Sequence, residues 1–244
     1  RFDAGEIHEI TLPNTPSSKY PDGDIIVSLG TFDIKEGQHN ISIYNVGEEI
    51  GFSQMMYNPV FENELDITFN TSFSKYGYFS KNSIDLSDAG FSTNSQVVCG
   101  LITKENFFNS TVEAKMVINE MTNDAYAGIV FNSTAYANYP SADADGINYN
   151  YPYCGFLLSF ENGEVALKYI KFKNHAILAR KSYDYVPGEE IDIKIIQNNN
   201  NYIVYIDGEE IFNINANICS LSGGVGVFAS NADAVFKTLK VNKD

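Results

Sequence analysis

Alternation between apolar and polar residues is the feature that most constrains the fold of this chain. Residues 191–195 read Ile-Asp-Ile-Lys-Ile, and four asparagines at 198–201 end the run. A spacing of two places one set of side chains on the buried face of a β-strand and the other set in solvent. Residues 95–241 contain no apolar pattern of helical spacing and length. The second half of the chain is therefore expected to be an antiparallel β-structure.

Turn residues divide the chain into many short strands. Asp207-Gly208 separates the runs 202–206 and 209–214, and this dipeptide favours a type I′ hairpin because such a turn needs positive φ. Other strands are expected at residues 78–80, 83–86, 96–103, 110–119, 125–132, 154–161, 164–173, 176–183, 223–229 and 234–241. Short strands at regular spacing predict an all-β fold, an antiparallel two-sheet β-sandwich.

The chain is expected to have two parts. Residues 1–65 contain short alternating runs, such as 24–29 and 40–46, and predict a small N-terminal β-subdomain. This part is either the tail of a preceding module or an extension that packs on the second half. The polar stretch 62–75 marks the boundary, and the sandwich occupies residues 66–244. The first residues, Arg-Phe-Asp, suggest a fragment of a larger protein.

Charge and composition exclude several classes of function. The 244 residues carry a formal net charge of −15, which repels nucleic acid and anionic membranes. No run is long and apolar enough for membrane insertion. The three cysteines, Cys99, Cys154 and Cys219, are far apart and form no metal or redox motif. Sixteen Tyr and 17 Phe suit strands.

Five motifs occur in an order that resembles a known family. They are FFNSTVEAKMVI at 107–118, AGIVF at 127–131, GFLLSFENGEV at 155–165, YIVYIDG at 202–208 and GVGVFA at 224–229. This order is similar to concanavalin A-like sandwiches, and most of all to the fructan-binding family 66 carbohydrate-binding modules of bacterial exo-levanases. The resemblance covers about 150 residues. It implies a concanavalin A-like jelly roll.

The resemblance also implies a function. Such a chain would be a non-catalytic, secreted or cell-surface module whose partners are a glycan ligand and the catalytic domain of its parent bacterial glycoside hydrolase. These modules often place an Arg that faces the ligand just after the strand that matches 127–131. Asn132 stands there instead, so a neutral amide replaces a planar cation and fructose specificity does not follow.

A long loop follows Asn132 and is the second candidate feature. It contains Tyr136, Tyr139, Tyr149, Tyr151 and Tyr153. Aromatic faces stack on sugar rings while amides and carboxylates bind hydroxyl groups, and long loops on a rigid scaffold tend to carry function. We expect these tyrosines, with Asn132, to bind carbohydrate. The alternative is that the tyrosines only pack the loop onto the sheet.

The same loop contains Asp143, Asp145 and Asn148 around Gly146. Alternating oxygen side chains around a glycine resemble a calcium-binding turn. The twelve-residue calcium loop is incomplete, because Pro152 stands where its bidentate Glu belongs. These three residues are the candidate calcium ligands, and the alternative is a turn capped by its own backbone.

Two further classes of function stay open. His8, His39 and His175 belong to no catalytic motif, and no nucleophile elbow occurs. Glu161 and Glu164 flank an Asn-Gly turn and are expected at a solvated hairpin tip. The chain could still be a sugar hydrolase of the same fold, or a structural spacer without a ligand.

Overall fold

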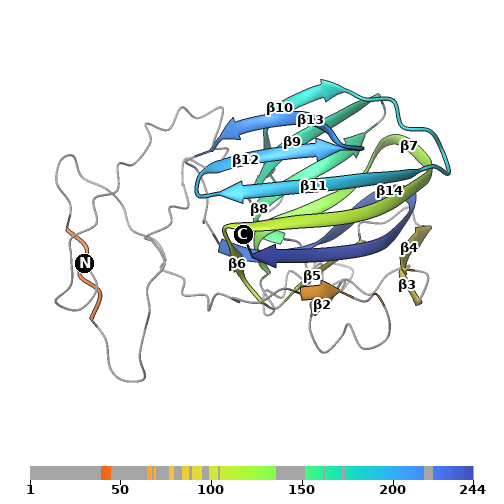
Figure 1. Cartoon of the computed structure of the whole chain (residues 1–244). Coiled ribbons are helices and arrows are strands. Elements are labelled where there is room, and N and C mark those ends of the chain that lie inside the picture. The colour runs from red at the N-terminus through yellow and green to blue at the C-terminus, as the bar shows by residue number, and fades with distance from the viewer. Residues whose placement is uncertain are drawn as a thin grey trace.

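The chain folds as a β-sandwich without helices in its described part (Figure 1). The computed structural model describes residues 40–44, 65–67, 69, 77–79, 84–87, 90–94, 99–103, 105–135, 152–161, 163–171, 174–216 and 222–243. Every regular element in these residues is a strand. No helix among them is long and apolar enough to cross a membrane. The predicted all-β class is confirmed.

The described residues contain fourteen strands. The first six are β1 (Leu65–Ile67), β2 (Gly77–Phe79), β3 (Ile84–Ser87), β4 (Gly90–Asn94), β5 (Cys99–Thr103) and β6 (Phe107–Phe108). The next four are β7 (Ser110–Ala135), β8 (Pro152–Glu161), β9 (Glu164–Lys171) and β10 (Asn174–Ser182). The last four are β11 (Glu190–Asn198), β12 (Asn201–Ile206), β13 (Glu209–Asn215) and β14 (Ser222–Lys243).

Two long strands connect the layers. β7 and β14 pair antiparallel from Ser110↔Lys243 to Ser133↔Gly224. Their register shifts near Asp124 and Asn231, which both have positive φ (64° and 53°). Such bulges bend a strand and increase its twist. The prediction of two separate strands in each of these regions was therefore wrong, because one bent strand runs through both layers.

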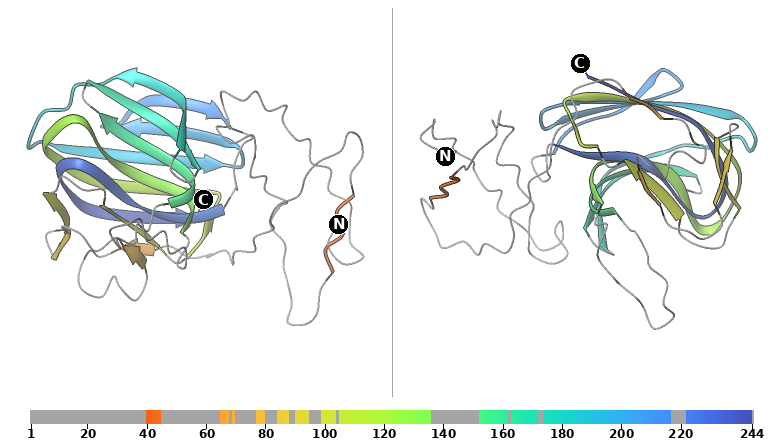
Figure 2. Two further views of the ribbon diagram at one scale, coloured as in Figure 1. Left: turned by 180° about the vertical axis from the view of Figure 1, so that it is seen from behind. Right: turned by 90° about the horizontal axis from the view of Figure 1, so that it is seen from below.

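The bend divides the continuous sheet into two layers (Figure 2). Layer A contains β13, β12 and β11, the first half of β7, the second half of β14, and β1, β4 and β3. Layer B contains β10, β9 and β8, the second half of β7, the first half of β14, and β5 and β2. β6 pairs with the start of β14.

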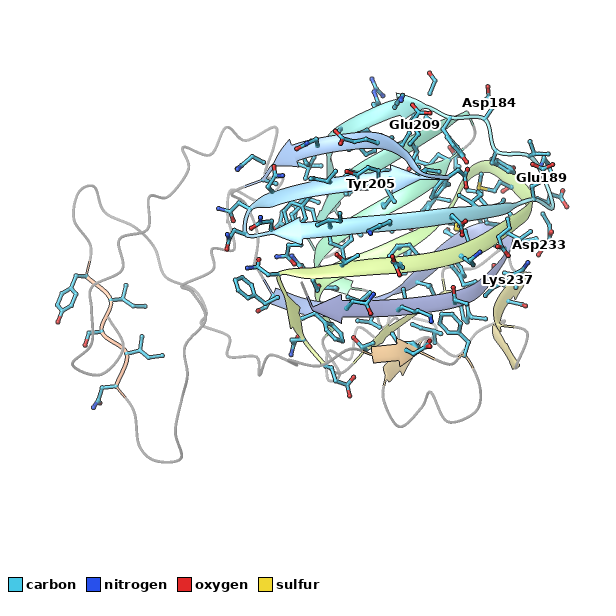
Figure 3. All side chains as sticks on the ribbon, in the orientation of Figure 1. Asp184, Glu189, Tyr205, Glu209, Asp233 and Lys237 are labelled. Atoms are coloured by element: carbon cyan, nitrogen blue, oxygen red, sulfur yellow. The ribbon has the colours of Figure 1, made fainter. Side chains whose placement is uncertain are left out.

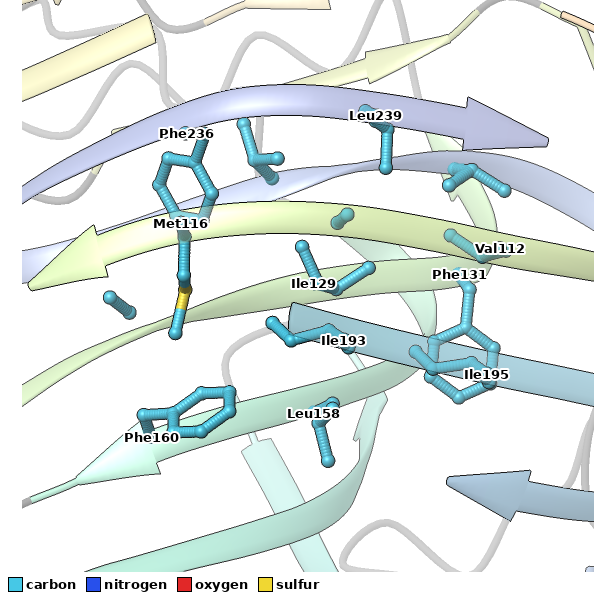
Figure 4. Packing of buried hydrophobic residues seen from close by; sticks show 14 of the residues in the cluster. Val112, Met116, Ile129, Phe131, Leu158, Phe160, Ile193, Ile195, Phe236 and Leu239 are labelled. Atoms are coloured by element: carbon cyan, nitrogen blue, oxygen red, sulfur yellow. The ribbon is translucent and has the colours of Figure 1, made fainter. Parts of the chain in front are cut away.

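The hydrophobic core lies between the layers (Figure 4). Ile193 and Ile195 of β11 are buried there together with Leu158 and Phe160 of β8. Aromatic rings fill its centre, and the centroids of Phe156 and Tyr202 lie 4.6 Å apart. The buried residues of β11 alternate along the strand, as the Ile-Asp-Ile-Lys-Ile pattern predicted.

The predicted hairpin at Asp207-Gly208 is confirmed. Both residues have positive φ, 51° and 82°, as a type I′ turn requires. Asp207 also fixes the turn through its side chain, because Oδ1 accepts a hydrogen bond from the Asp192 amide at 2.9 Å. The asparagine run forms the turn between β11 and β12, as expected.

The N-terminal part agrees less well with the sequence patterns. Residues 40–44 lie in the expected strand 40–46, but only Ile41 forms an isolated bridge. Ile41 and Ile43 are exposed, so alternation there does not mark a buried strand face. β1 lies inside the stretch expected to be a polar boundary, and it pairs with β14 of the sandwich. The other strands expected before residue 62 lie outside the described residues.

Candidate functional site

The outer face of layer A is an ordinary solvated surface (Figure 3). Ion pairs cover it, and one network joins Lys115 and Lys237 to Glu190 at 2.7 and 2.8 Å. These two hydrogen bonds lower the pKa of Glu190 to about 2. Lys194 pairs with Glu113 in the same way across two neighbouring strands. Charges of both signs in alternation are typical of a face that contacts only water.

The outer face of layer B is different, because apolar side chains are buried on it. Its cluster is separate from the core between the layers and comprises Ile102, Val130, Leu157, Ile170 and Phe228, with Tyr126 packed against them. β8 provides the sequence signal for this second buried face. Its run Phe156-Leu157-Leu158 is apolar without alternation, which indicates burial on both sides of a strand.

One row of directly opposed residues crosses this face. We call it the central row, and register places Arg180, Ala166, Ser159, Gly128, Phe228 and Gly100 in it, from β10 to β5. Opposed residues in an antiparallel sheet share a face. The middle of the row contains only small side chains. Ala166 and Ser159 are fully buried and Phe228 is 3% exposed, so the exposed side chain of the row is that of Arg180 at the edge of the sheet.

A charged cluster lies beside the middle of the central row. Lys168 Nζ and Ser159 Oγ both donate hydrogen bonds to Glu161 Oε1, the latter at 2.7 Å. The Lys168 side chain is only 9% exposed, whereas that of Glu161 is 23% exposed. The turn after Glu161 forms as expected, and Glu161 is only partly solvated, because its carboxylate accepts both of these hydrogen bonds. Glu161 lies on the same face as Lys168, which requires a partner for its buried ammonium group.

An aromatic stack borders the same cluster. The rings of Tyr126 and Phe228 are stacked at 5.7 Å between centroids, and the Lys168 ammonium lies 5.8 Å from the Tyr126 ring centroid. Phe228 rests on Gly100, where any Cβ would approach its Cδ2 to 2.5 Å. The glycine therefore allows the ring to lie flat on the sheet. Tyr126 is half-buried, and one side of its ring packs on Phe228.

His175 occupies the edge strand on the same face. It pairs in register with Ile170, which pairs with Gly155. Burial and then the charge of Lys168 lower the pKa of His175 below its ordinary 6.5, while Glu161 acts in the opposite direction. His175 is therefore mainly neutral at pH 7 and offers a hydrogen-bonding group rather than a charge.

Asn132 lies at the end of β7, where the tyrosine-rich loop begins. Its side chain is 3% exposed, and Nδ2 donates a hydrogen bond to Tyr202 Oη at 3.0 Å. The φ of Asn132 is 47°. Gly223 packs so closely on its backbone that a Cβ added at position 223 would lie 2.4 Å from the Asn132 carbonyl carbon. The described role of Asn132 is thus to anchor the strand end. Its predicted contact with a sugar stays a prediction.

The other predicted site residues are not brought together by described structure. Seven of them lie outside the described residues, namely Tyr136, Tyr139, Tyr149, Tyr151, Asp143, Asp145 and Asn148. Tyr153 belongs to β8, next to the start of the strand. Within the described part of the chain, no three His, Cys, Asp or Glu side chains form a group that could hold a metal ion. The calcium site therefore stays a prediction.

Comparisons with known proteins identify the fold. The chain is similar to a Bacillus subtilis protein of unknown function with a galectin-like fold, at TM-score 0.57 and 13% identity over 78% of this chain and 98% of the other. It is also similar to carbohydrate binding module CBM66 from Bacillus subtilis, at TM-score 0.55 and 14% identity over 67% and 94%. A β-1,3-1,4-glucanase (lichenase) from a mouse hindgut metagenome matches at TM-score 0.55 and 11% identity over 75% and 100%.

These likenesses confirm the sandwich fold and the predicted structural resemblance to family 66 modules. No family model matches the sequence, and no curated protein matches it either. Proteins with different activities share this fold, so the function must be argued from the surface of this chain.

Proposed function

We propose that this chain is a non-catalytic carbohydrate-binding module of a larger, secreted or surface-attached bacterial glycoside hydrolase. The single observation that carries the proposal is the difference between the two outer faces. Layer A presents paired charges to solvent. The outer face of layer B instead carries the half-buried Tyr126 stacked on a buried phenylalanine, an exposed arginine and a largely buried ion pair. Sugar-binding surfaces combine aromatic platforms with a few directed polar groups.

The proposed site lies on the outer face of layer B. Tyr126 would stack on a sugar ring, and Glu161, Arg180 and His175 would bind hydroxyl or charged groups. The tyrosine-rich loop joins β7 to β8, the two central strands of this face. We expect the predicted tyrosines of this loop to add further platforms to the site.

Affinity gel electrophoresis of the whole chain against neutral and acidic polysaccharides tests the proposal. Tyr126→Ala is expected to weaken binding about two- to twelvefold, because one stacking contact contributes about 0.5–1.5 kcal/mol. Tyr205→Ala is the matched control, since Tyr205 is a half-buried tyrosine on the outer face of layer A. Tyr149→Ala and Tyr151→Ala test the loop separately.

Two results would refute the proposal. If no polysaccharide retards the chain, the spacer interpretation is favoured. If Tyr205→Ala weakens binding as much as Tyr126→Ala, the site is not on layer B. Thermal denaturation of each variant shows whether a loss of binding reflects a loss of folding.

One observation favours a second function, glycoside hydrolysis. Glu161 and Glu164 are directly opposed in register on the outer face of layer B, and two carboxyl groups on one face are what such a reaction requires. Glu161→Gln and Glu164→Gln would then each abolish the release of reducing sugar. Binding without turnover by the unmodified chain would exclude this alternative for the glycans tested.

A further inference from the structure

Positive charge in this acidic chain is concentrated in one segment. Residues 165–183, which cover most of β9 and β10, contain no Asp or Glu. They contain five of the 16 Lys and Arg residues of the chain, namely Lys168, Lys171, Lys173, Arg180 and Lys181. The two strands form one edge of layer B. The sequence of this edge is therefore basic, although the net charge of the whole chain is −15.

Carboxylates already neutralise two of these cations. Lys168 pairs with Glu161, and Lys181 pairs with Glu209 of β13 at 2.9 Å. Lys181 is opposite the buried Val165 in register and so lies on the core side of β10. Its ion pair connects the edges of the two layers. These two lysines have structural partners.

Arg180 is different. It is exposed and forms no ion pair with any described residue. It is also one of only two arginines in the chain, the other being Arg1. A free guanidinium group on an acidic protein has no evident structural role, whereas its neighbour Lys181 has one. Arg180 is therefore available to a ligand.

The position of Arg180 connects it with the proposed glycan site. It begins the central row, in which Ala166, Ser159 and Gly128 separate it from Phe228. Four strand spacings of about 4.8 Å put β10 and β14 roughly 19 Å apart. Ala166 and Ser159 are fully buried, and the Lys168–Glu161 pair lies beside them on this face. A ligand that extends from the exposed guanidinium group to the half-buried Tyr126 would therefore lie over this pair.

We propose that the glycan bound on this face is an acidic one and that Arg180 binds its carboxylate group. This inference rests on the proposed carbohydrate-binding function and specifies its ligand class. A guanidinium group presents two parallel N–H donors that match the two oxygens of a carboxylate, which neither a lysine nor an amide can do. Neutral sugars do not need such a fork.

The overall negative charge does not oppose this assignment at contact distance. Exposed charges farther apart than about 8 Å are largely screened at physiological ionic strength. The acid nearest to the middle of the central row, Glu161, is already bonded to Lys168. Glu164, which is opposite Ser182 in register, is the other acid of this face close to Arg180, whereas the acids of layer A are distant.

The test compares matched ligands and matched variants of the whole chain. Polygalacturonate and alginate are the acidic probes, and fully methyl-esterified polygalacturonate is the neutral probe with the same backbone. We expect at least one of the two acidic probes to bind. If polygalacturonate binds, its methyl-esterified form should bind at least about tenfold more weakly. Arg180→Gln should weaken binding of the acidic polymer about tenfold, because a charge-assisted hydrogen bond is lost.

Two further variants separate the carboxylate fork from simple charge. Arg180→Lys keeps the charge but loses the fork, so its affinity should lie between those of the native chain and Arg180→Gln. Lys240→Gln removes a cation from layer A, where Lys240 pairs with Asp66 at 3.1 Å. This control should bind the acidic polymer as the native chain does.

The outcomes distinguish this inference from the proposed function. Binding of neutral polysaccharides only, or acid binding that Arg180→Gln does not change, overturns the inference and leaves carbohydrate binding intact. Equal affinity for the esterified and free polymers also overturns it. Failure to bind any acidic or neutral polysaccharide overturns both.

Discussion

The ion pair between Lys168 and Glu161 permits a quantitative prediction, because its two partners are buried to different extents. The Lys168 side chain is 9% exposed and that of Glu161 is 23% exposed. Replacing Glu161 by Met leaves an ammonium group among apolar side chains without a carboxylate. Replacing Lys168 by Met leaves a carboxylate that reaches water and still accepts a hydrogen bond from Ser159. The two single substitutions should therefore have unequal costs.

The expected magnitudes follow from this difference. Glu161→Met should lower the free energy of unfolding by about 3–4 kcal/mol, which is typical of an uncompensated buried charge. Lys168→Met should lower it by only about 1 kcal/mol, because the remaining carboxylate is hydrated. The double variant should be within about 1 kcal/mol of the native chain, since a buried pair can often be replaced by apolar residues at little cost.

Urea denaturation monitored by tyrosine fluorescence measures these values, and the two single variants and the double variant form a thermodynamic cycle. For a sandwich of this size, the cost of Glu161→Met corresponds to a fall in Tm of roughly 6–16 °C. Lys194→Met is the control, because Lys194 and Glu113 are both 45% exposed and such a pair contributes less than about 1 kcal/mol. Equal costs for the two single variants, or a double variant whose cost is their sum, would refute the reasoning.

Four further predictions address other parts of the chain. Gly128→Ala should destabilise the fold by about 3 kcal/mol, because a Cβ at this position would lie 1.9 Å from the Leu158 carbonyl oxygen. Gly208 has a φ of +82° and open space around it, so Gly208→Ala should cost only about 1 kcal/mol. Urea denaturation of the two variants measures the difference. Burial, and then Asp207, raise the pKa of Tyr183 from 10 to about 12, so an ultraviolet titration should show one late phenol that Tyr183→Phe removes. The unfolded chain ionises this phenol first, and its contribution to stability should therefore be lost as the pH rises from 10 to 12. The Glu190 carboxyl, with a pKa of about 2 against an ordinary 4.5, should stabilise the fold above pH 4.5 and lose this effect toward pH 2; carboxyl NMR should show Lys237→Gln raising its pKa. If calcium binds at Asp143, Asp145 and Asn148, 1 mM calcium should raise the Tm of the native chain and not that of Asp145→Ala, and an equal rise in both would place the ion elsewhere.

The strands that the sequence predicts best are those with one face exposed to solvent. β11, β12 and β13 alternate between buried and exposed positions, and the turn at Asp207-Gly208 has a single favourable geometry. Such local signals do not depend on what lies across the sheet. The long strands β7 and β14 were harder to predict, because their bulges at Asp124 and Asn231 resemble loops in sequence. Pairing along their whole length keeps each strand continuous.

The candidate site was harder still to predict, because it depends on strand register. The tyrosines mark the loop after Asn132 in the sequence, but no local pattern marks Tyr126 or Phe228 as site residues. These residues are about one hundred positions apart, and only the pairing of Tyr126 with Ser230 and of Gly128 with Phe228 brings them together. A uniformly apolar segment of β8 was the one local sign that apolar side chains are buried on this outer face.

Arg180 and Lys181 show why a charge pattern alone cannot separate structure from binding. In the sequence they form one basic pair, and either could be taken for part of a solvated edge. In the sheet, successive residues point to opposite faces, so Lys181 reaches Glu209 across the sandwich edge while Arg180 lies on the outer face of layer B. The lysine has its carboxylate within the protein. No described carboxylate completes the same interaction for the arginine, and we propose that a ligand supplies it.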